Sequence, residues 1–334
     1  MGNIGIYGFG RIGRTMLRAA LERKLFVPSH IGDVKDPSTL AALFEVDSNF
    51  GRWPEEAAFE DGAIRVGGRR IGFVDTAAAV PDWGALGVDV VVDCSGRGTR
   101  RENAQAHLAK GARKVLVSAG PKSLADCDAV LLPGINLDSY DPKKHHIVSM
   151  GSCTTNALAP VVKILRENLG IESGLFSTVH SYTNSQSLTD QPMADRRDSW
   201  AAAENLIPSS SGAAKALLFI WPDLPVSGKA YRVPTRTGSI VELVATVGKA
   251  TDAAAVRQLF REAADSAALR GILGVLEGEY ASSRIVGEPR SSIIDLPLTA
   301  VMKGRLVSVA AWYDNEYGFS TRLAETAALL ASRV

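Results

Sequence analysis

The first half of the chain alternates between short apolar runs and longer segments that carry apolar residues at helical spacing. The run over 3–7 predicts a strand, and the segment 14–24 that follows predicts a helix. The same order then repeats, with strands predicted to end at Asp33 and to cover 88–93, 114–118, 129–132 and 147–150, and a helix near 101–110. Near-continuous apolar strands that alternate with helices predict a doubly wound, Rossmann-type parallel sheet.

The pattern changes after about residue 150, where longer segments of β character become common. They lie over 174–182, 229–233, 239–247 and 306–313, with helical patterns over 252–267 and 321–331. We therefore expect a second α+β domain built on a mixed, largely antiparallel sheet. A chain of 334 residues also exceeds the usual size of a single core. The expected domains are 1–151 and 152–314, with a C-terminal helix within 315–334 that packs back onto the first.

Composition and charge narrow the classes of partner. Hydrophobic residues make up 46% of the chain and charged residues 22%, as in an ordinary globular enzyme. The net charge of +1 gives no electrostatic reason to expect nucleic acid or an anionic membrane as the main partner. The three cysteines form no disulfide framework, and no apolar run reaches the roughly 20 residues that span a bilayer. We expect a cytoplasmic protein without a signal peptide or a metal site.

A glycine-rich turn, Gly8-x-Gly10-x-x-Gly13, follows the first predicted strand and opens the first predicted helix. Glycines at these positions let backbone N–H groups approach a pyrophosphate at the helix N-terminus. Asp33 lies 20 positions beyond Gly13, where a carboxylate accepts hydrogen bonds from ribose hydroxyls and repels a 2′-phosphate. A purely structural turn is the alternative, but the surrounding strand, helix and acidic residue favour NAD binding, and NAD over NADP.

Cys153 stands just before the periodic apolar run 157–165, which predicts a helix. The unpaired N–H groups of a helix N-terminus produce a positive field that favours a thiolate, so this cysteine is a candidate nucleophile. His180 comes 27 residues later, at the end of the strand-like run 175–179, and is a candidate partner base. A single histidine is more often a satisfied core or surface residue, so spacing alone does not assign it to catalysis.

Six segments, in order over the whole chain, resemble the glyceraldehyde-3-phosphate dehydrogenase family. They are GFGRIGR (8–14), SCTTNALAP (152–160), TVHSYTNSQ (178–186), SGAAKA (211–216), YRVPT (231–235) and WYDNEYGFS (312–320). SCTTN and WYDNE together are far more specific than a glycine motif alone. The resemblance makes Cys153 and His180 the expected catalytic pair.

The resemblance implies an NAD-dependent, phosphorylating oxidation of glyceraldehyde 3-phosphate to 1,3-bisphosphoglycerate. Cys153 would form a hemithioacetal and then a thioester, His180 would take the proton as hydride leaves, and inorganic phosphate would release the acyl group. The expected substrate and phosphate residues are Ser152, Thr154, Thr183, Ser211, Gly212 and Arg232. The expected cofactor-binding residues are Gly8, Gly10, Arg11, Ile12, Gly13, Asp33, Ser95, Gly96, Ser118, Asn315 and Tyr317. The family's long polar loop packs against a neighbouring subunit, which implies a homotetramer.

That loop departs from the family pattern. Where the family usually reads DLRRAR, an ungapped alignment puts Asp198 in place of an arginine that binds phosphate, and Trp200 replaces another arginine. The first change shifts the local charge by two units. At ~5 Å and an effective dielectric of 20, each charge pair is worth on the order of 3 kcal/mol before screening. A compensated slip of one residue, which would return Arg197 to the site, is the alternative.

The departure keeps a second function open. The chain would then be a paralogous aldehyde dehydrogenase of the same fold that takes a different phosphorylated aldehyde or uses a different acyl acceptor, as erythrose-4-phosphate dehydrogenases do. A third hypothesis is a non-catalytic NAD-binding relative. Retention of Cys153, His180, Asn315 and Arg232 together argues against it.

Overall fold

The structure is a computed structural model that describes residues 2–334 and divides into two compact units. The first unit comprises Met1–Gly151 together with Ser320–Val334, and the second comprises Ser152–Phe319. Each unit contains one large sheet with helices, as the two sequence patterns predicted. Within residues 2–334, no helix is both long enough and apolar enough to cross a membrane.

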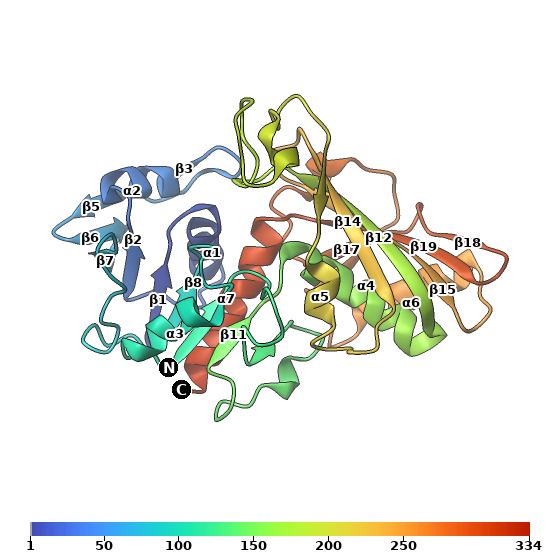
Figure 1. Ribbon diagram of the computed structural model, residues 1–334, viewed down its shortest axis with the longest axis horizontal. Coiled ribbons are helices and arrows are strands. Elements are labelled where there is room, and N and C mark those ends of the chain that lie inside the picture. Colours follow the sequence, from blue (N-terminus) through green and yellow to red (C-terminus); the bar gives the residue numbers. More distant parts are fainter. Residues whose placement is uncertain (1) are drawn as a thin grey trace. The chain divides into compact units, whose positions relative to one another are not determined.

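The first unit is built on a nine-stranded sheet in the order β10-β11-β9-β8-β1-β2-β7-β6-β5 (Figure 1). Its strands are β1 (Ile4–Tyr7), β2 (His30–Asp33), β5 (Ala57–Glu60), β6 (Ala63–Val66), β7 (Arg69–Asp75), β8 (Val90–Asp93), β9 (Lys114–Val117), β10 (Ala129–Val130) and β11 (Ile147–Ser149). All neighbours from β10 to β7 are parallel, which confirms the predicted parallel sheet. The central strands β8 and β9 are buried along their whole length, which explains their unbroken apolar runs.

The other edge of this sheet is antiparallel, which the apolar pattern did not predict. β5, β6 and β7 form two hairpins. Asp61, Gly62 and Gly67 in the connecting turns have φ of 49°, 69° and 56°, the left-handed values that two-residue hairpin turns require. β3 (Val46–Asp47) and β4 (Gly51–Arg52) form a separate short ribbon.

The helices of the first unit include one from the far end of the chain. They are α1 (Arg11–Glu22), α2 (Pro37–Glu45), α3 (Arg101–Ala109), the short 3-10 helix η1 (Leu137–Ser139) and the part of α7 (Tyr317–Ser332) that follows Phe319. Leu323 and Leu330 of α7 are fully buried. The N–H of Gly2 donates to the carbonyl oxygen of Ala331 at 2.7 Å. The C-terminal residues therefore complete the core of the first unit.

The second unit is built on an eight-stranded mixed sheet in the order β13-β14-β12-β15-β19-β17-β16, with β18 beside β19 (Figure 1). Its strands are β12 (Ile171–Ser181), β13 (Ile207–Ser210), β14 (Val226–Val233), β15 (Ser239–Val247), β16 (Leu273–Leu276), β17 (Ser292–Asp295), β18 (Ala300–Met302) and β19 (Leu306–Tyr313). Only β12–β14 and β16–β17 are parallel pairs, which confirms the largely antiparallel sheet. The parallel pair β12–β14 brings the C-terminal ends of both strands to one edge.

Helix α4 (Cys153–Leu169) packs on one face of this sheet, against β15 and β19. Its first turn has a capping box, in which the side chains of Ser152 and Thr155 each bond the other residue's backbone N–H. Gly170 ends it with a φ of 72°. The remaining helices of the unit are α5 (Ala213–Leu217), α6 (Ala253–Asp265), and the 3-10 helices η2 (Arg196–Ser199) and η3 (Ser282–Ile285).

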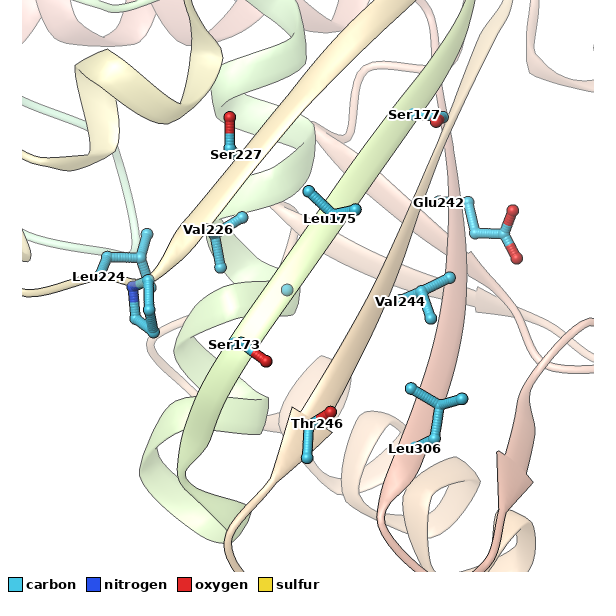
Figure 2. A pocket seen from close by; sticks show the side chains of 12 residues that line it. Ser173, Leu175, Ser177, Leu224, Val226, Ser227, Glu242, Val244, Thr246 and Leu306 are labelled. Atoms are coloured by element: carbon cyan, nitrogen blue, oxygen red, sulfur yellow. The ribbon is translucent and has the colours of Figure 1, made fainter.

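The opposite face of the sheet carries apolar side chains that no described residue covers. The residues of β12 alternate between core and surface, so that Phe176 is buried while Leu175 is 69% exposed. A groove of about 790 Å³ runs over this face, lined by Leu175, Val244 and Leu306 among others (Figure 2). We call this surface the open sheet face.

Candidate active site

The candidate nucleophile and base lie beside each other in the second unit. Cys153 is the first residue of α4, where the Ser152 cap fixes the backbone. His180 is 3% exposed near the end of β12. Its Nε2 lies 3.3 Å from Sγ of Cys153, so the two residues that are 27 positions apart in sequence form a hydrogen-bonded couple. The pair expected from the resemblance is present in the structure.

A tyrosine that the sequence analysis did not single out supports this pair. The buried hydroxyl of Tyr313, on β19, is 3.0 Å from Thr154 Oγ1 and 2.7 Å from Thr178 Oγ1. Its ring meets the His180 ring edge-on, with centroids 5.9 Å apart. Tyr313 lies in the WYDNE motif, which is the signal in the sequence that could have pointed to it. Through Thr154 and Thr178, its hydroxyl links β19 to α4 and to β12.

Burial shifts the pKa of both members of the pair. It raises the pKa of the Cys153 thiol, although the Arg232 charge and hydrogen bonds from Thr154 act in the opposite direction. The helix field favours a thiolate, and desolvation acts against it. Burial, followed by the Arg232 charge, lowers the pKa of His180 to about 3. Both pKa shifts favour the neutral forms of the two side chains.

Arg232 contacts the base directly. It lies opposite His180 in the parallel register of β12 and β14. Its Nη1 is 2.7 Å from Nδ1 of His180 and 3.4 Å from the carbonyl oxygen of Ser181. Its Nε is buried and has no hydrogen-bond partner among residues 2–334. A half-buried guanidinium with an unused donor is suited to bind an anion.

The long polar segment after β12 holds Thr183 in a chain of hydrogen bonds. Oε1 of Gln186 accepts from the N–H and the hydroxyl of Thr183 at 3.0 and 3.2 Å, and Nε2 of Gln186 donates to Oδ1 of Asp198 at 3.0 Å. Asp198 is half-buried, whereas Arg197 is exposed. The structure thus places the carboxylate of Asp198, and not the charge of Arg197, two hydrogen bonds from Thr183.

The other predicted phosphate residues occupy two helix starts. The hydroxyl of Ser152 caps α4, and Thr154 lies buried in its first turn. Ser211 and Gly212 form the turn before α5, where the Ser211 hydroxyl accepts from the N–H of Ala213 at 3.3 Å. Among the described residues, neither Ser211 nor Gly212 forms a hydrogen bond with Cys153 or His180. Their phosphate role stays a prediction.

The glycine turn of the first unit has the geometry of a dinucleotide loop. Gly8 has a φ of 90°, and a Cβ on it would lie 2.6 Å from the N of Ser95. A Cβ on Gly13 would overlap the carbonyl oxygen of Gly8, so this glycine sets the close packing of α1. A Cβ on Gly10 would meet no described atom within 4 Å. Gly10 therefore faces open space at the N-terminus of α1, beside Arg11 and Ile12.

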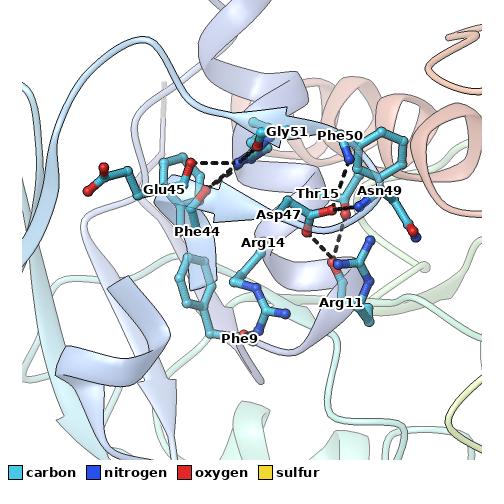
Figure 3. A network of polar contacts seen from close by, with 11 residues as sticks. Phe9, Arg11, Arg14, Thr15, Phe44, Glu45, Asp47, Asn49, Phe50 and Gly51 are labelled. Atoms are coloured by element: carbon cyan, nitrogen blue, oxygen red, sulfur yellow. Dashed lines mark hydrogen bonds and ion pairs between the residues drawn. The ribbon is translucent and has the colours of Figure 1, made fainter. Parts of the chain in front are cut away.

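Two carboxylates bind residues of this turn. Oδ2 of Asp33, at the end of β2, accepts from the N–H of Phe9 at 2.6 Å. Arg11 pairs with Asp47, which also accepts from the N–H groups of Asn49 and Phe50 (Figure 3). Although burial raises the pKa of Asp47, these donors outweigh it and hold the pKa below its usual value. The side chain of Arg11 is thus engaged by the carboxylate of Asp47.

Ser95, Gly96 and Ser118 lie at the C-terminal ends of neighbouring parallel strands. Ser95 follows β8 and donates through its N–H and hydroxyl to Oδ1 of Asp93, at 2.9 and 2.6 Å. Gly96 has a φ of 78° with open space around it. Ser118 follows β9, and its N–H donates to the carbonyl oxygen of Asp93 at 3.0 Å. Ligands of doubly wound sheets bind at this end of the strands.

Asn315, in the second unit, has an amide of fixed orientation. Its Oδ1 accepts from the N–H of Gly238 at 3.1 Å and from the hydroxyls of Ser239 and Thr237 at 3.0 and 3.4 Å. Three donors on the oxygen leave the amide nitrogen as the group that offers hydrogen bonds to a ligand. Tyr317 begins α7, where its N–H donates to Asp314 at 2.8 Å. Burial raises the pKa of Asp314.

The fold and the site define a class: a dinucleotide-binding enzyme with a cysteine nucleophile and a histidine partner. Comparison with known families agrees. Residues 2–101 match the NAD binding domain of glyceraldehyde 3-phosphate dehydrogenase, and residues 152–315 match its C-terminal domain. The chain belongs to the glyceraldehyde-3-phosphate dehydrogenase family.

Relatives that the chain matches over nearly their full length are named glyceraldehyde-3-phosphate dehydrogenase. The glyceraldehyde-3-phosphate dehydrogenase of Kitasatospora aureofaciens is 46% identical over 340 residues and covers 100% of both chains. That of Geobacillus stearothermophilus is 43% identical over 335 residues, covering 99% of this chain and 98% of its own. That of Streptomyces coelicolor is 42% identical over 336 residues, covering 99% of both.

Proposed function

We propose that this protein catalyses the NAD-dependent, phosphorylating oxidation of glyceraldehyde 3-phosphate to 1,3-bisphosphoglycerate. The observation that carries the proposal is the couple between Cys153 Sγ and His180 Nε2 at 3.3 Å, in a chain with full-length relatives of that name. The first unit would act as the NAD-binding domain and the second as the catalytic domain. Cytoplasmic localisation stays a prediction.

Different residues of this chain act in different steps of the reaction. The sulfur of Cys153 attacks the aldehyde carbon as its S–H proton passes to the aldehyde oxygen, and the N–H of Cys153 at the start of α4 would face that oxygen. When the hemithioacetal is oxidised, its O–H proton passes to Nε2 of His180 and the O–H electron pair forms the carbonyl of the thioester. Phosphate then attacks the thioester carbon, and the C–S bond breaks to return Cys153. Arg232 holds the terminal phosphate of the substrate.

The glycine turn fits a dinucleotide. Gly10 leaves an open space at the N-terminus of α1, and the carboxylate of Asp33 stands beside that turn through its bond to Phe9. NAD, when bound, would supply the acceptor for the hydride that leaves the substrate carbon. Asn315 would orient its nicotinamide amide, because the amide nitrogen of Asn315 is directed by three donors on its oxygen.

The test of the activity uses the purified protein with NAD and glyceraldehyde 3-phosphate. We expect NADH to form at a rate that rises with inorganic phosphate, and Cys153→Ser to abolish it. His180→Asn should lower kcat by about 10²–10⁴-fold, the usual range for a lost general base. No NADH from a folded protein that binds NAD would overturn the proposal. NADH formation without any dependence on phosphate would favour the paralogous function with another acyl acceptor.

We also propose that the protein is a homotetramer and that the open sheet face is one of its subunit contacts. The family resemblance of the long polar loop supports assembly. Leu175 at 69% and Leu306 at 40% exposure support the choice of surface, because contiguous exposed apolar residues mark interaction sites. A second copy of the same chain would cover the face by two-fold symmetry, which makes a flat sheet surface self-complementary.

A further inference from the structure

A single buried hydroxyl links the strand that carries the candidate base to the amide of Asn315. Ser239 begins β15 and is buried. Its Oγ accepts from the N–H of Ser181 at 3.1 Å, and its hydroxyl donates to Oδ1 of Asn315 at 3.0 Å. Ser181 directly follows His180 on β12, and its carbonyl oxygen lies 2.6 Å from Nδ1 of that ring. Ser239 is therefore bonded both to the residue after the base and to the candidate cofactor anchor.

The neighbours of Ser239 fix the direction of its hydroxyl proton. A serine hydroxyl has one proton and two lone pairs. The N–H of Ser181 only donates, so it occupies a lone pair and cannot receive the proton. The proton is left for Oδ1 of Asn315, which is identified as the amide oxygen because the N–H of Gly238 also donates to it at 3.1 Å. The hydroxyl thus transmits one orientation, from the backbone of β12 to the Asn315 amide.

Ser239 is the stronger of the two side-chain donors to the Asn315 oxygen. The hydroxyl of Thr237 also has one proton, and it lies 3.0 Å from Oδ1 of Asp314 but 3.4 Å from Oδ1 of Asn315. The nearer carboxyl oxygen takes the larger share of that proton, because hydrogen bonds weaken with distance. Thr237 therefore holds Asn315 only weakly. Without the hydroxyl of Ser239, the N–H of Gly238 would be the main donor to the amide oxygen.

The order of the strands explains how one residue reaches both partners. β15 lies between β12 and β19 in the sheet and is antiparallel to each. The start of β15 therefore lies beside the C-terminal ends of both neighbours, where Ser181 ends β12 and Asn315 follows β19. The turn before Ser239 is also fixed, because Gly238 has a φ of 89° and a Cβ on it would lie 2.9 Å from the carbonyl oxygen of Ser282. The fold thus sets both bonds of Ser239.

We propose that Ser239 is a positioning residue for hydride transfer. It holds the amide of Asn315 in the orientation that receives the nicotinamide amide, and it sets that orientation relative to the strand end that carries His180. One hydroxyl thereby places the hydride acceptor and the base with respect to each other. Ser239 acts through Asn315 and Ser181 and needs no contact of its own with substrate or cofactor. The inference rests on the proposed oxidation and adds this residue to it.

The direct test is a double-mutant cycle on the Kd of NAD, measured by calorimetry on the full chain without any aldehyde. Ser239→Ala should raise this Kd about two- to tenfold, the range for one lost hydrogen bond. Asn315→Ala removes the anchor itself and should raise it at least as much. The double variant should match Asn315→Ala within about twofold, because Ser239 acts through Asn315. Effects that multiply, or an unchanged Kd in Ser239→Ala, would overturn the inference.

Two further variants separate positioning from a general loss of stability. Ser292→Ala removes a buried hydroxyl from β17 of the same sheet, and this hydroxyl has no hydrogen-bond partner among residues 2–334. It is the matched control and should leave the Kd of NAD unchanged. Ser239→Cys keeps the size of the side chain but offers only a weak donor, so the protein should fold and its Kd should rise as in Ser239→Ala. Wild-type affinity in Ser239→Cys would contradict the role of the hydroxyl.

The kinetic test follows hydride transfer itself. With glyceraldehyde 3-phosphate deuterated at the aldehyde carbon, Ser239→Ala should have a kcat about three- to tenfold lower and a larger primary isotope effect than the wild type, because the transfer slows relative to the other steps. A lower kcat without a larger isotope effect would place the loss in another step and contradict the inference. Absence of NADH from the wild type would instead contradict the proposed function, and the NAD cycle would still decide whether Ser239 acts through Asn315.

Discussion

At the scale of single residues, the hydrogen-bond chain from Thr183 through Gln186 to Asp198 distinguishes this protein from its family pattern. The chain fixes the Thr183 hydroxyl as a donor to Gln186, and it ends on a carboxylate where a cation is usual. A charge of the same sign as the substrate's phosphate weakens anion binding, although solvent screens much of the effect at a half-buried site. We therefore expect the carboxylate of Asp198 to oppose phosphate binding.

Removal of this charge should strengthen anion binding. Asp198→Asn keeps an acceptor oxygen for Gln186, so the hydrogen-bond chain survives while the charge is lost. We expect KM for glyceraldehyde 3-phosphate, for inorganic phosphate or for both to fall about three- to tenfold, the screened effect of one nearby charge. Initial rates at two ionic strengths measure it.

Asp195→Asn serves as the control for Asp198→Asn, because it removes an exposed charge from the same loop and keeps the cap on the Arg197 N–H. It should change both KM values less than twofold, within the effect of a screened surface charge. Unchanged KM values in Asp198→Asn, or a large drop in its kcat, would show that the carboxylate has another role.

At the scale of elements, the apolar pattern predicted the buried strands of the first sheet and did not predict its short antiparallel strands. The runs over 88–93 and 114–118 match β8 and β9 because strands covered on both faces need unbroken apolar residues. The hairpins of β5, β6 and β7 were not predicted, because these strands mix charged residues with apolar ones and contain no long apolar run. Asp61-Gly62 was the readable signal there, since its left-handed backbone is typical of a tight hairpin turn.

The candidate site was likewise predictable from the sequence only in part. The start of α4 at Cys153 could be predicted from the residues around it, but its contact with His180 could not, because the packing of α4 against β12 brings the two together across 27 positions. The family resemblance supplied that contact. Neither source pointed to the contact between Arg232 and Nδ1 of His180, since it depends on the pairing of β12 with β14.

Two glycines of the dinucleotide turn should respond differently to the same substitution. Gly10→Ala adds a methyl group to open space, so the melting temperature should stay within a few degrees while NAD affinity falls at least about tenfold. Gly13→Ala forces α1 away from Gly8, so the protein itself should lose about 1–3 kcal/mol of stability. Thermal unfolding with and without NAD measures both. Equal effects of the two variants on stability would contradict this division of roles.

At the scale of the whole molecule, the open sheet face is the part of the second unit that its own chain does not cover. Its groove of about 790 Å³ has apolar side chains from β12, β15 and β19. A monomer that left such a surface in water would forgo the stabilisation that burial of apolar area provides. Assembly of copies is the simplest way to recover it.

A charge on this face should disrupt assembly. Sedimentation of the wild type should give about four times the chain mass of 35.5 kDa. Leu175→Asp places a carboxylate in the proposed contact, where its desolvation opposes association, so the mass should fall. Leu43→Asp, at a 44% exposed position of α2, is the control and should sediment as the wild type. A wild type that sediments as a single chain would contradict the proposal.

Residues 320–334 complete the first unit, and this has a consequence for the order in which the two units can fold during synthesis. On the ribosome, residues 2–151 emerge early but lack the buried side chains of Leu323 and Leu330 until residues 320–334 have left the exit tunnel. The second unit is one uninterrupted segment, residues 152–319, and emerges before them. Synthesis therefore favours an order in which the second unit has all of its residues first, while the first unit waits for residues 320–334.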